Sequence, residues 1–399
     1  MADRIIFHVD VNSAYLSWEA VRRLREDPES VDLRTIPSAV GGDRAQRRGV
    51  ILAKSIPAKK YGVVTGEPVT DALKKCPQLE LVLPDFELYR KNSAAVMEMM
   101  SRYSGRIEQF SIDEAFMDMT GMRGDPVATA HELKDRIRED LGFTVNIGIS
   151  ENKLLAKMAS DFEKPDKVHT LWHREIPEKM WPLPVTDLLY IGEATRKKLA
   201  DMGIHTIGEI ARMDRRILQA HLKSHGLLIH DYANGIDDSP VETDRGNAPN
   251  KGYGHSTTTP FDVTDMQTAR SYLLHLSEMV AARLREDRVK AGMVSVTIRN
   301  TEMETSSHQM SLPVATDVTA EIYGAACKCL SELWKGEPLR LLGVRTGRIK
   351  EEEPRQLTLF DDFDYEKHRR AEETMDELRS RFGSGAVIRA RFAPPPEER

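Results

Sequence analysis

The sequence predicts a multidomain α+β protein. Its 399 residues exceed what one hydrophobic core usually organises, so we expect several domains of roughly 100 residues each. Strand and helix patterns are mixed in residues 4–150 and again in residues 255–349. Between them, residues 183–211 have the pattern of short helices broken by Gly192 and Gly203. Two mixed regions therefore flank an all-helical one.

The first mixed region opens with a strand that ends in an acid. Residues 4–11, RIIFHVDV, form a β-branched run, which predicts a buried strand with Asp10 at its end. Helical apolar spacing follows from Ala14 to Leu24. A loop rich in Gly and Arg then leads to a short strand over 50–53, after which come the basic residues Lys54, Lys59 and Lys60.

A pair of adjacent acids lies 103 positions after Asp10 in the chain. Residues 106–119, RIEQFSIDEAFMDM, alternate apolar side chains around Asp113 and Glu114, which predicts a hairpin. The neighbouring segments are predicted as a helix over 94–103, a helix over 125–138 with Gly142 beyond its end, and a strand over 143–150. One sheet could therefore bring Asp10 next to the other two acids.

The chain after the helical region continues through a polar tether. Residues 237–250, DDSPVETDRGNAPN, have the composition of a linker and predict a domain boundary. The later elements are predicted as strand 255–261, helix 268–290, strands 293–300 and 307–314, a second helix, strand 339–349, and a helix ending at Gly383. The second mixed region is thus an α+β domain with a helix-bearing tail.

Composition sets broad limits on location and partners. The formal net charge is −6, but an acidic total can conceal a basic groove, since binding depends on where Lys and Arg cluster. No apolar run approaches the roughly 20 residues that span a bilayer, and the start lacks signal-peptide features. The cysteines Cys76, Cys327 and Cys329 lack the paired spacing of a zinc site. We expect a cytoplasmic protein with buried thiols and no membrane contact.

The three acids suit phosphoryl transfer chemistry. Transfer of a nucleotide to a hydroxyl needs in-line geometry and charge neutralisation, which two Mg²⁺ ions about 4 Å apart supply through shared carboxylates. Asp10, Asp113 and Glu114 are the candidate ligands. Any single strand-end acid more often just faces water, so spacing alone leaves both interpretations open.

The residues around these acids resemble the motifs of a known family. HVDVNSAYLSWE (8–19) and FSIDEAFMD (110–118) are similar to the two catalytic motifs of the Y-family DNA polymerases. The resemblance continues in the family's order through GISENKLLAKMASDFEKP (148–165), IGEATRKKL and LLGVRTG, and it is closest to the DinB, or polymerase IV, branch. It implies a right-hand polymerase with a palm (1–30 and 76–166), fingers (31–75), a helical thumb with a helix-hairpin-helix (167–236), a linker (237–250), a DNA-binding little finger (251–349) and a flexible tail (350–399).

That resemblance implies an activity and a set of catalytic residues. The protein would be a template-directed, low-fidelity DNA polymerase that adds deoxynucleotides to a primer 3′ end by two-metal-ion catalysis, in translesion synthesis and DNA repair. Mg²⁺ would be held by Asp10, Asp113, Glu114 and the main-chain carbonyl of Val11. Tyr15 would be the steric gate, whose ring excludes a ribose 2′-hydroxyl. The alternative for Tyr15 is a core aromatic.

The incoming nucleotide would contact both palm and fingers. The residues implied are Ser13, Ala14, Tyr15, Ser55, Lys59, Asp161 and Lys164. The fingers depart from the family pattern, because many relatives place a Tyr and an Arg where this chain has Ile56 and Lys59. Lysine keeps the charge but loses bidentate donation, so triphosphate binding that is weaker or differently oriented is expected.

Two further partners follow from the resemblance. Primer–template DNA would contact Gly192, Arg196 and Lys197 in the thumb and Thr257, Thr258, Arg299 and Arg345 in the little finger. QLTLF is similar to the peptide by which bacterial polymerases dock onto the sliding clamp, through Gln356, Leu357, Leu359 and Phe360. The alternative for the thumb residues is a common glycine turn between two helices. For the little-finger residues it is solvated charge, and for QLTLF it is a stray hydrophobic tail. We expect a monomer.

Two other function classes compete with a polymerase. A nucleotidyl cyclase can share a palm-like sheet and two metal-binding acids without needing DNA, but the helical hairpin and the clamp-like peptide argue against it. A non-catalytic DNA-binding scaffold of the same fold is disfavoured, because all three acids and Tyr15 are retained. Primer extension separates these functions.

Overall fold

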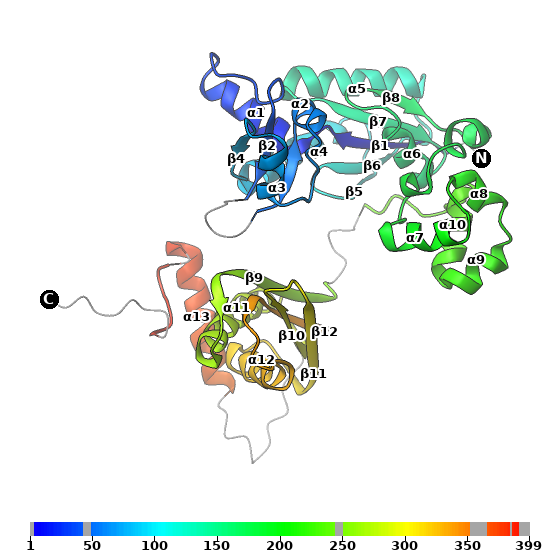
Figure 1. Cartoon of the computed structure of the whole chain (residues 1–399). Coiled ribbons are helices and arrows are strands. Elements are labelled where there is room, and N and C mark those ends of the chain that lie inside the picture. The colour runs from blue at the N-terminus through cyan, green and yellow to red at the C-terminus, as the bar shows by residue number, and fades with distance from the viewer. Residues whose placement is uncertain (1–3, 43–48, 244–249, 352–364, 384, 391–399) are drawn as a thin grey trace. The chain divides into compact units, whose positions relative to one another are not determined.

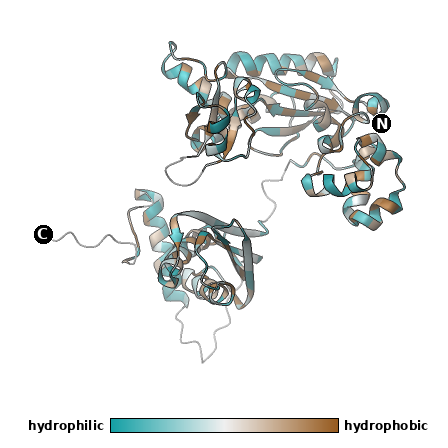
Figure 2. Ribbon diagram, in the orientation of Figure 1, coloured by the Kyte–Doolittle hydropathy of each residue, from teal (hydrophilic) through white to brown (hydrophobic). Residues whose placement is uncertain are grey.

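Two compact units make up the described part of the chain. The computed structural model describes residues 4–42, 49–243, 250–351, 365–383 and 385–390. These residues divide into one unit before and one unit after residues 244–249 (Figure 1). Each unit has its own hydrophobic core. In both, the helices carry hydrophobic bands beside hydrophilic ones (Figure 2), as expected for helices with one buried face.

The first unit is built around a five-stranded sheet. Its strands, in spatial order, are β5 (Ile107–Gln109), β6 (Glu114–Asp118), β1 (Ile6–Val11), β7 (Val145–Ser150) and β8 (Val168–Thr170). The central strand β1 is buried along its whole length, since helices cover both faces of the sheet. Its Phe7, Val9 and Val11 face the largest core, whereas the opposite face holds Ile6 with the buried polar residues His8 and Asp10. The strand and hairpin predicted around the three acids are confirmed.

Three helices pack against one face of this sheet through the largest core. They are α1 (Ala14–Glu26), α4 (Phe86–Ser101) and α5 (Pro126–Leu141). Asp125 caps the start of α5, and Gly142 ends it with φ of 86°, as the sequence predicts. Helix α4 begins eight residues before the predicted position 94, because Asp85 accepts hydrogen bonds from the first amides of the helix and sets its start.

A small second sheet with its own core precedes α4. It consists of β3 (Ile51–Lys54), β2 (Ser38–Gly41) and β4 (Glu80–Val82), with helices α2 (Ile56–Lys60) and α3 (Val69–Lys75). Only β3 was predicted. The other elements are three to seven residues long, too short for a helical or strand period to emerge from the sequence.

The helical part of the first unit follows β8. Its helices are α7 (Glu193–Asp201), α8 (Ile207–Arg212), α9 (Arg215–Leu222) and α10 (Ser224–Ala233), and the all-helical prediction is confirmed. Helix α6 (Lys153–Ser160) connects this part to the sheet. Its Leu154, Leu155 and Met158 belong to the core of the helical part, while Ala156 packs against the sheet.

The segment after α10 is bound to the sheet rather than free. The backbone amide of Leu154 donates to Asp237 at 3.1 Å, and Lys153 donates to the carbonyl of Pro240 at 3.2 Å. The amide of Glu242 donates to Glu108 at 2.9 Å. The sequence predicts a tether that starts at residue 237, whereas the structure attaches its first six residues to the first unit.

The second unit is a four-stranded antiparallel sheet covered on one face by two helices. The strand order is β11 (Thr305–Thr316), β10 (Val289–Asn300), β12 (Leu339–Glu351) and β9 (Gly252–Val263). Helices α11 (Met266–Glu286) and α12 (Thr319–Leu333) close the core. All these elements were predicted in their order along the chain; their spatial order was not predicted. In the chain as described, no helix is long and apolar enough to cross a membrane.

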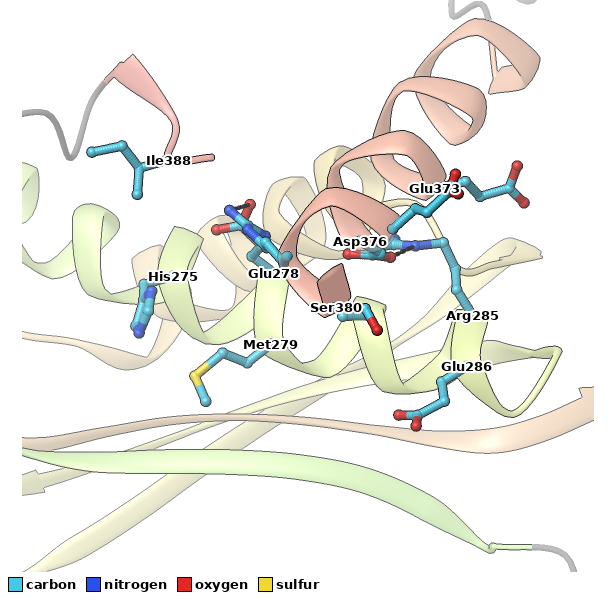
Figure 3. A pocket seen from close by; sticks show the side chains of 12 residues that line it. His275, Glu278, Met279, Arg285, Glu286, Glu373, Asp376, Ser380 and Ile388 are labelled. Atoms are coloured by element: carbon cyan, nitrogen blue, oxygen red, sulfur yellow. Dashed lines mark hydrogen bonds and ion pairs between the residues drawn. The ribbon is translucent and has the colours of Figure 1, made fainter. Parts of the chain in front are cut away.

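Helix α13 (Tyr365–Phe382) packs on α11 through buried ion pairs (Figure 3). Arg285, on α11, lies 2.7 Å from both Glu372 and Asp376 of α13, and the hydroxyl of Tyr365 donates to Asp317 at 2.6 Å. Beside these pairs lies a cavity of about 830 Å³. The sequence predicts this helix but places it in a flexible tail, whereas the structure packs it against the second unit.

Candidate active site

The fold brings the three predicted acids to one end of the central sheet. Asp10, near the end of β1, is the register partner of Glu114 at the start of β6. The backbone amide of Val11 donates to the carbonyl of Asp113 at 3.0 Å. Residues more than 100 positions apart in the sequence therefore become neighbours through strand pairing alone.

Asp10 is a buried carboxylate held by a lysine. It is 7% exposed, and Lys164 donates to its Oδ2 at 3.0 Å and to Asp161 at 2.8 Å. Burial raises the pKa of Asp10 to about 7; Lys164 opposes this rise, whereas the charges of Glu114 and Asp161 add to it. Asp10 is thus a carboxylate that gains from any further nearby cation.

The other two acids have partners of their own. Lys157 donates to Glu114 at 2.8 Å, and the Nε2 atom of the buried His8 lies 4.0 Å from the same carboxylate. Asp113 accepts a hydrogen bond from the hydroxyl of Ser111 at 2.6 Å. Lys157 was not predicted. No signal in the sequence set it apart, because α6 carries a second lysine, Lys153, and a lysine on a helix most often faces water.

The donor set fits a hard divalent cation. Carboxylate oxygens are the ligands that Mg²⁺ prefers, and the raised pKa of Asp10, caused by burial, shows a negative charge short of compensation. In the residues that the structure describes, no three His, Cys, Asp or Glu side chains are close enough together to hold an ion. Instead, the ammonium groups of Lys164 and Lys157 occupy positions beside Asp10 and Glu114.

The loop that carries Lys164 is anchored to the sheet by two asparagines. Asn12 accepts from the amide of Asp166 at 2.9 Å and donates to Asn146 at 3.0 Å. Asn146 donates to the carbonyl of Glu163 at 2.6 Å. Buried amides with satisfied hydrogen bonds are costly to replace, so this network keeps Lys164 beside Asp10.

A cavity of about 410 Å³ opens beside the acids. Its walls come from the end of β1, the start of α1, the β3–α2 segment and the Lys164 loop. Of the predicted nucleotide-binding residues, Ser13, Ala14, Tyr15, Ser55, Lys59 and Lys164 line it, together with Asp10, Val11 and Asp113. Asp161 does not line the cavity but pairs with Lys164. Lys54 and Thr65 also line it and were not predicted.

Tyr15 has a fixed ring at the cavity wall. Its ring stacks on Tyr89 with centroids 4.5 Å apart and meets Phe86 edge-on at 6.2 Å. Tyr89 is itself held, because its hydroxyl donates to the buried Glu19 at 2.8 Å. Burial raises the pKa of Tyr15, and the charge of Asp113 adds to this. A neutral aromatic face, stacked on Tyr89, therefore borders the cavity.

The start of α1 also faces this cavity. Ser13 precedes the helix in the left-handed conformation, with φ of 46°, and its side chain makes no capping hydrogen bond. The first amides of a helix have no partners within the helix, and together with the helix dipole they favour anions. The arrangement suits a negatively charged group next to Ser13 and Ala14.

The predicted DNA contacts in the helical part lie at the start of α7. Gly192 is the N-cap residue of α7. Arg196 makes two hydrogen bonds of 2.7 Å to Glu193 on the same helix, and Lys197 lies 3.9 Å from the same carboxylate. A phosphate at this helix start would compete with Glu193 for both cations.

In the second unit the strand register divides the predicted contacts between two faces. Arg299 and Thr258 both pair with Leu341 of β12, and Arg345 pairs with Ser295 of β10, which places the first three on the face away from the helices. Thr257 pairs with the core residue Leu342 and shares its face. The peptide QLTLF, with Gln356, Leu357, Leu359 and Phe360, lies outside the described residues.

Comparisons with known proteins cover nearly the whole chain. The impB/mucB/samB family model matches residues 9–161, and the model of its C-terminal domain matches residues 250–359. A helix-hairpin-helix motif of the same family matches residues 173–204. Helix α13 lies beyond all three matches.

Curated relatives and a solved structure agree with these matches. The chain is 44% identical to DNA polymerase IV of Clostridium acetobutylicum, over 97% of this chain and 98% of that protein. It is 34% identical to DNA polymerase IV 1 of Bacillus subtilis, over 96% of this chain and 92% of that protein. The fold matches a Y-family DNA polymerase chimera with a TM-score of 0.75 and 22% identity, covering 87% of this chain and 99% of that one.

Proposed function

The chain belongs to the impB/mucB/samB family of Y-family DNA polymerases, and we propose that it copies DNA templates, including damaged ones, by adding deoxynucleotides to a primer. The observation that carries the proposal is the cavity that joins Asp10 and Asp113 with Tyr15, Lys59 and Lys164. It combines a site for divalent cations, a site for a triphosphate and an aromatic wall for the sugar. The predicted low fidelity follows from membership of this family.

The reaction transfers one nucleotidyl group. The primer 3′-oxygen attacks the α-phosphorus of the deoxynucleoside triphosphate, a new phosphorus–oxygen bond forms, and the bond to the β-phosphate breaks to release pyrophosphate. Divalent cations, when bound, would stabilise the negative charge that develops on the transferred group and favour ionisation of the attacking hydroxyl. Positioning by the protein converts the encounter into an in-line approach, which accounts for much of the rate.

The cation ligands that we propose are those that the family resemblance implies, and the strand geometry supports them. Asp10, Asp113 and Glu114, with the main-chain carbonyl of Val11, would hold two Mg²⁺ ions. Asp10 and Glu114 are register partners, and Asp10 and Asp113 share the cavity wall. Lys157 would release Glu114 when a cation approaches, because the two compete for one carboxylate.

The nucleotide would lie with its sugar on Tyr15 and its phosphates between two cationic walls. Ser13 and Ala14 at the α1 start, Lys164 from the loop, and Ser55 with Lys59 from the fingers are the proposed contacts. Asp161 would position Lys164 through their 2.8 Å ion pair. The ring of Tyr15, fixed against Tyr89, would collide with a ribose 2′-hydroxyl.

The remaining parts are proposed to hold DNA and a partner protein. The palm (1–30 and 76–166), fingers (31–75), thumb (167–236), linker (237–250) and little finger (251–349) are assigned as the resemblance implies. Gly192, Arg196 and Lys197 would contact the DNA backbone from the thumb, and Thr257, Thr258, Arg299 and Arg345 from the little finger. QLTLF would bind the sliding clamp. The enzyme would act as a cytoplasmic monomer.

Primer extension tests the reaction and the ligands together. A labelled primer annealed to a DNA template is incubated with Mg²⁺ and deoxynucleotides, using the wild type and the double variant Asp113→Ala plus Glu114→Ala. We expect template-dependent extension that disappears in the variant while its affinity for primer–template DNA persists.

Three other results would contradict the proposal. Retained activity in the variant would overturn the ligand assignment. A folded, DNA-bound wild type without extension would favour the scaffold function. Conversion of a nucleoside triphosphate to a cyclic product without DNA would favour the cyclase.

A further inference from the structure

Lys54, a lysine without a predicted role, forms part of the nucleotide cavity. Lys54 is the last residue of β3, and Leu52 and Lys54 project from the same side of that strand. Both line the cavity, as does Lys59 from α2. The fingers therefore present two lysines to the same space.

Lys54 is held in place by a second cavity residue. Its ammonium donates a hydrogen bond to the hydroxyl of Thr65 at 3.1 Å, and Thr65 lies on the cavity wall. A hydroxyl partner orients the lysine without neutralising its charge. Lys54 is thus positioned with two remaining donors and a full positive charge.

Neither lysine of this wall has an acidic partner among the described side chains: no described carboxylate lies within ion-pair distance of Lys54 or Lys59. Glu67, the acid that acts most on Lys54, is occupied by Lys75 and by the amide of Val64. Burial lowers the pKa of Lys54, and the charge of Lys59 lowers it further. The wall therefore carries uncompensated positive charge that an anion would stabilise.

Ile56, one of the four residues between the two lysines in the sequence, adds no polar group. Ile56 lines the cavity and is 53% exposed, so it offers an apolar surface where a hydrogen-bond donor would be useful to a phosphate. Among the fingers residues that line the cavity, Ser55 and Thr65 supply hydroxyls, and Lys54 and Lys59 are the cations.

We propose that Lys54 is a substrate-binding residue that contacts the terminal phosphates of the incoming deoxynucleoside triphosphate, together with Lys59. This inference rests on the proposed polymerase function. The α-phosphorus must lie at Asp10 and Asp113, where the bond changes occur, so the β- and γ-phosphates extend from there between the lysine wall and Lys164. The two lysine ammonium groups act as point charges where many relatives have one bidentate arginine. Point charges tolerate more than one phosphate geometry.

The test measures affinity as a function of phosphate number, without chemistry. A primer ending in a dideoxynucleotide is bound to its template and the holoenzyme with Mg²⁺, and the complementary nucleoside tri-, di- and monophosphates are titrated. Lys54→Met is compared with Lys54→Arg and with Lys60→Met. Lys60 is an exposed lysine at the end of α2 that lies outside the cavity wall.

We expect Lys54→Met to weaken triphosphate affinity about tenfold, the loss typical of one charge-assisted hydrogen bond. Monophosphate affinity should stay unchanged, Lys54→Arg should restore most of the loss, and Lys60→Met should match the wild type. An equal loss for all three ligands would indicate a purely structural lysine and overturn the inference, as would unchanged triphosphate affinity. Should Lys54→Met unfold, Lys54→Gln provides the same comparison.

This outcome is separable from failure of the proposed function. Extension by the wild type with unchanged nucleotide affinity in Lys54→Met would sink the role of Lys54 alone. A wild type that neither extends primers nor binds nucleotide in the template complex would sink both.

Discussion

Burial and the charge of Lys164 shift the pKa of Asp10 in opposite directions. Asp10 sits where its charge is costly, as its raised pKa of about 7, caused by burial, shows. Lys164 and Lys157 offset part of that cost for Asp10 and Glu114. In the proposed mechanism, divalent cations, which carry more charge to the same oxygens, would replace these ammonium groups.

At Tyr15 we predict a change in sugar selection. Tyr15→Ala removes the ring that is held against Tyr89 and opens the space that a 2′-hydroxyl would need. Incorporation of ribonucleotides relative to deoxynucleotides should rise by about 10-fold or more. The measurement is single-nucleotide extension with each sugar in separate reactions.

Tyr15→Phe is the matched control for this prediction. It keeps the ring and its stacking but lacks the hydroxyl, so discrimination should remain as in the wild type. If alanine at position 15 left sugar selection unchanged while extension continued, Tyr15 would be an ordinary core aromatic.

Helix α6 links chemistry and architecture at the scale of elements. One of its faces packs on β7 and the other on the helical part. It also carries Lys157 toward Glu114. The helix can lie this close to the sheet because Gly148 of β7 has no side chain. A Cβ atom there would be 1.9 Å from the carbonyl oxygen of Ala156.

We predict that Gly148→Ala destabilises the first unit. The added carbon would meet backbone atoms of α6, which cannot move aside as a side-chain end can, so the helix must shift. The expected loss is about 3 kcal/mol, at the upper end of the usual cost of overpacking. Urea unfolding of the full chain, followed by circular dichroism, measures it.

Gly105→Ala serves as the comparison in the same unit. A Cβ at Gly105 would meet nothing within 4 Å, so its unfolding midpoint should stay close to that of the wild type. Equal stability of Gly148→Ala and the wild type would refute the close helix–sheet contact described here.

At the scale of the whole molecule, each unit binds the last segment of its own part of the chain through hydrogen bonds. The chain leaves the first unit only after Glu242, whose amide is bound by Glu108. Helix α13, which follows β12 in the sequence, packs on the second unit through Tyr365, which donates to Asp317, and through Glu372, which accepts from Arg285. The clamp-like peptide therefore lies between two folded elements, β12 and α13, rather than at a chain end.

Truncation of two apolar side chains in QLTLF tests whether this peptide binds the sliding clamp. Leu357→Ala plus Phe360→Ala should weaken binding to the sliding clamp by about 30-fold or more, the loss expected when buried interface anchors are truncated. Extension without clamp should be unaffected. Surface plasmon resonance on immobilised clamp, with parallel extension assays, gives both quantities.

Thr358→Ala, between the two anchors, should bind the clamp as the wild type does. Full clamp binding by the double variant would show that QLTLF is a stray hydrophobic segment. It would not contradict the proposed polymerase activity.

The sequence alone determined those features that depend on local pattern. Buried strands such as β1, the capped helix α5 and the long elements of the second unit span one or more full periods, so their type and order could be predicted. The positions of Asp10, Asp113 and Glu114 at strand ends followed from the same patterns. Their assignment as a set came from the similarity of the surrounding residues to a family.

Only the tertiary structure decided which side chains share the site. Lys54 and Lys157 look like surface lysines in the sequence, and no period distinguishes a lysine that faces a cavity from one that faces water. The short elements around β2 and α3 were missed for a related reason, since their conformation is set by the core they share. The packing of α13 likewise depends on Arg285, which lies 87 positions from Glu372. Such partners are selected by long-range contacts, and a local sequence pattern contains no record of them.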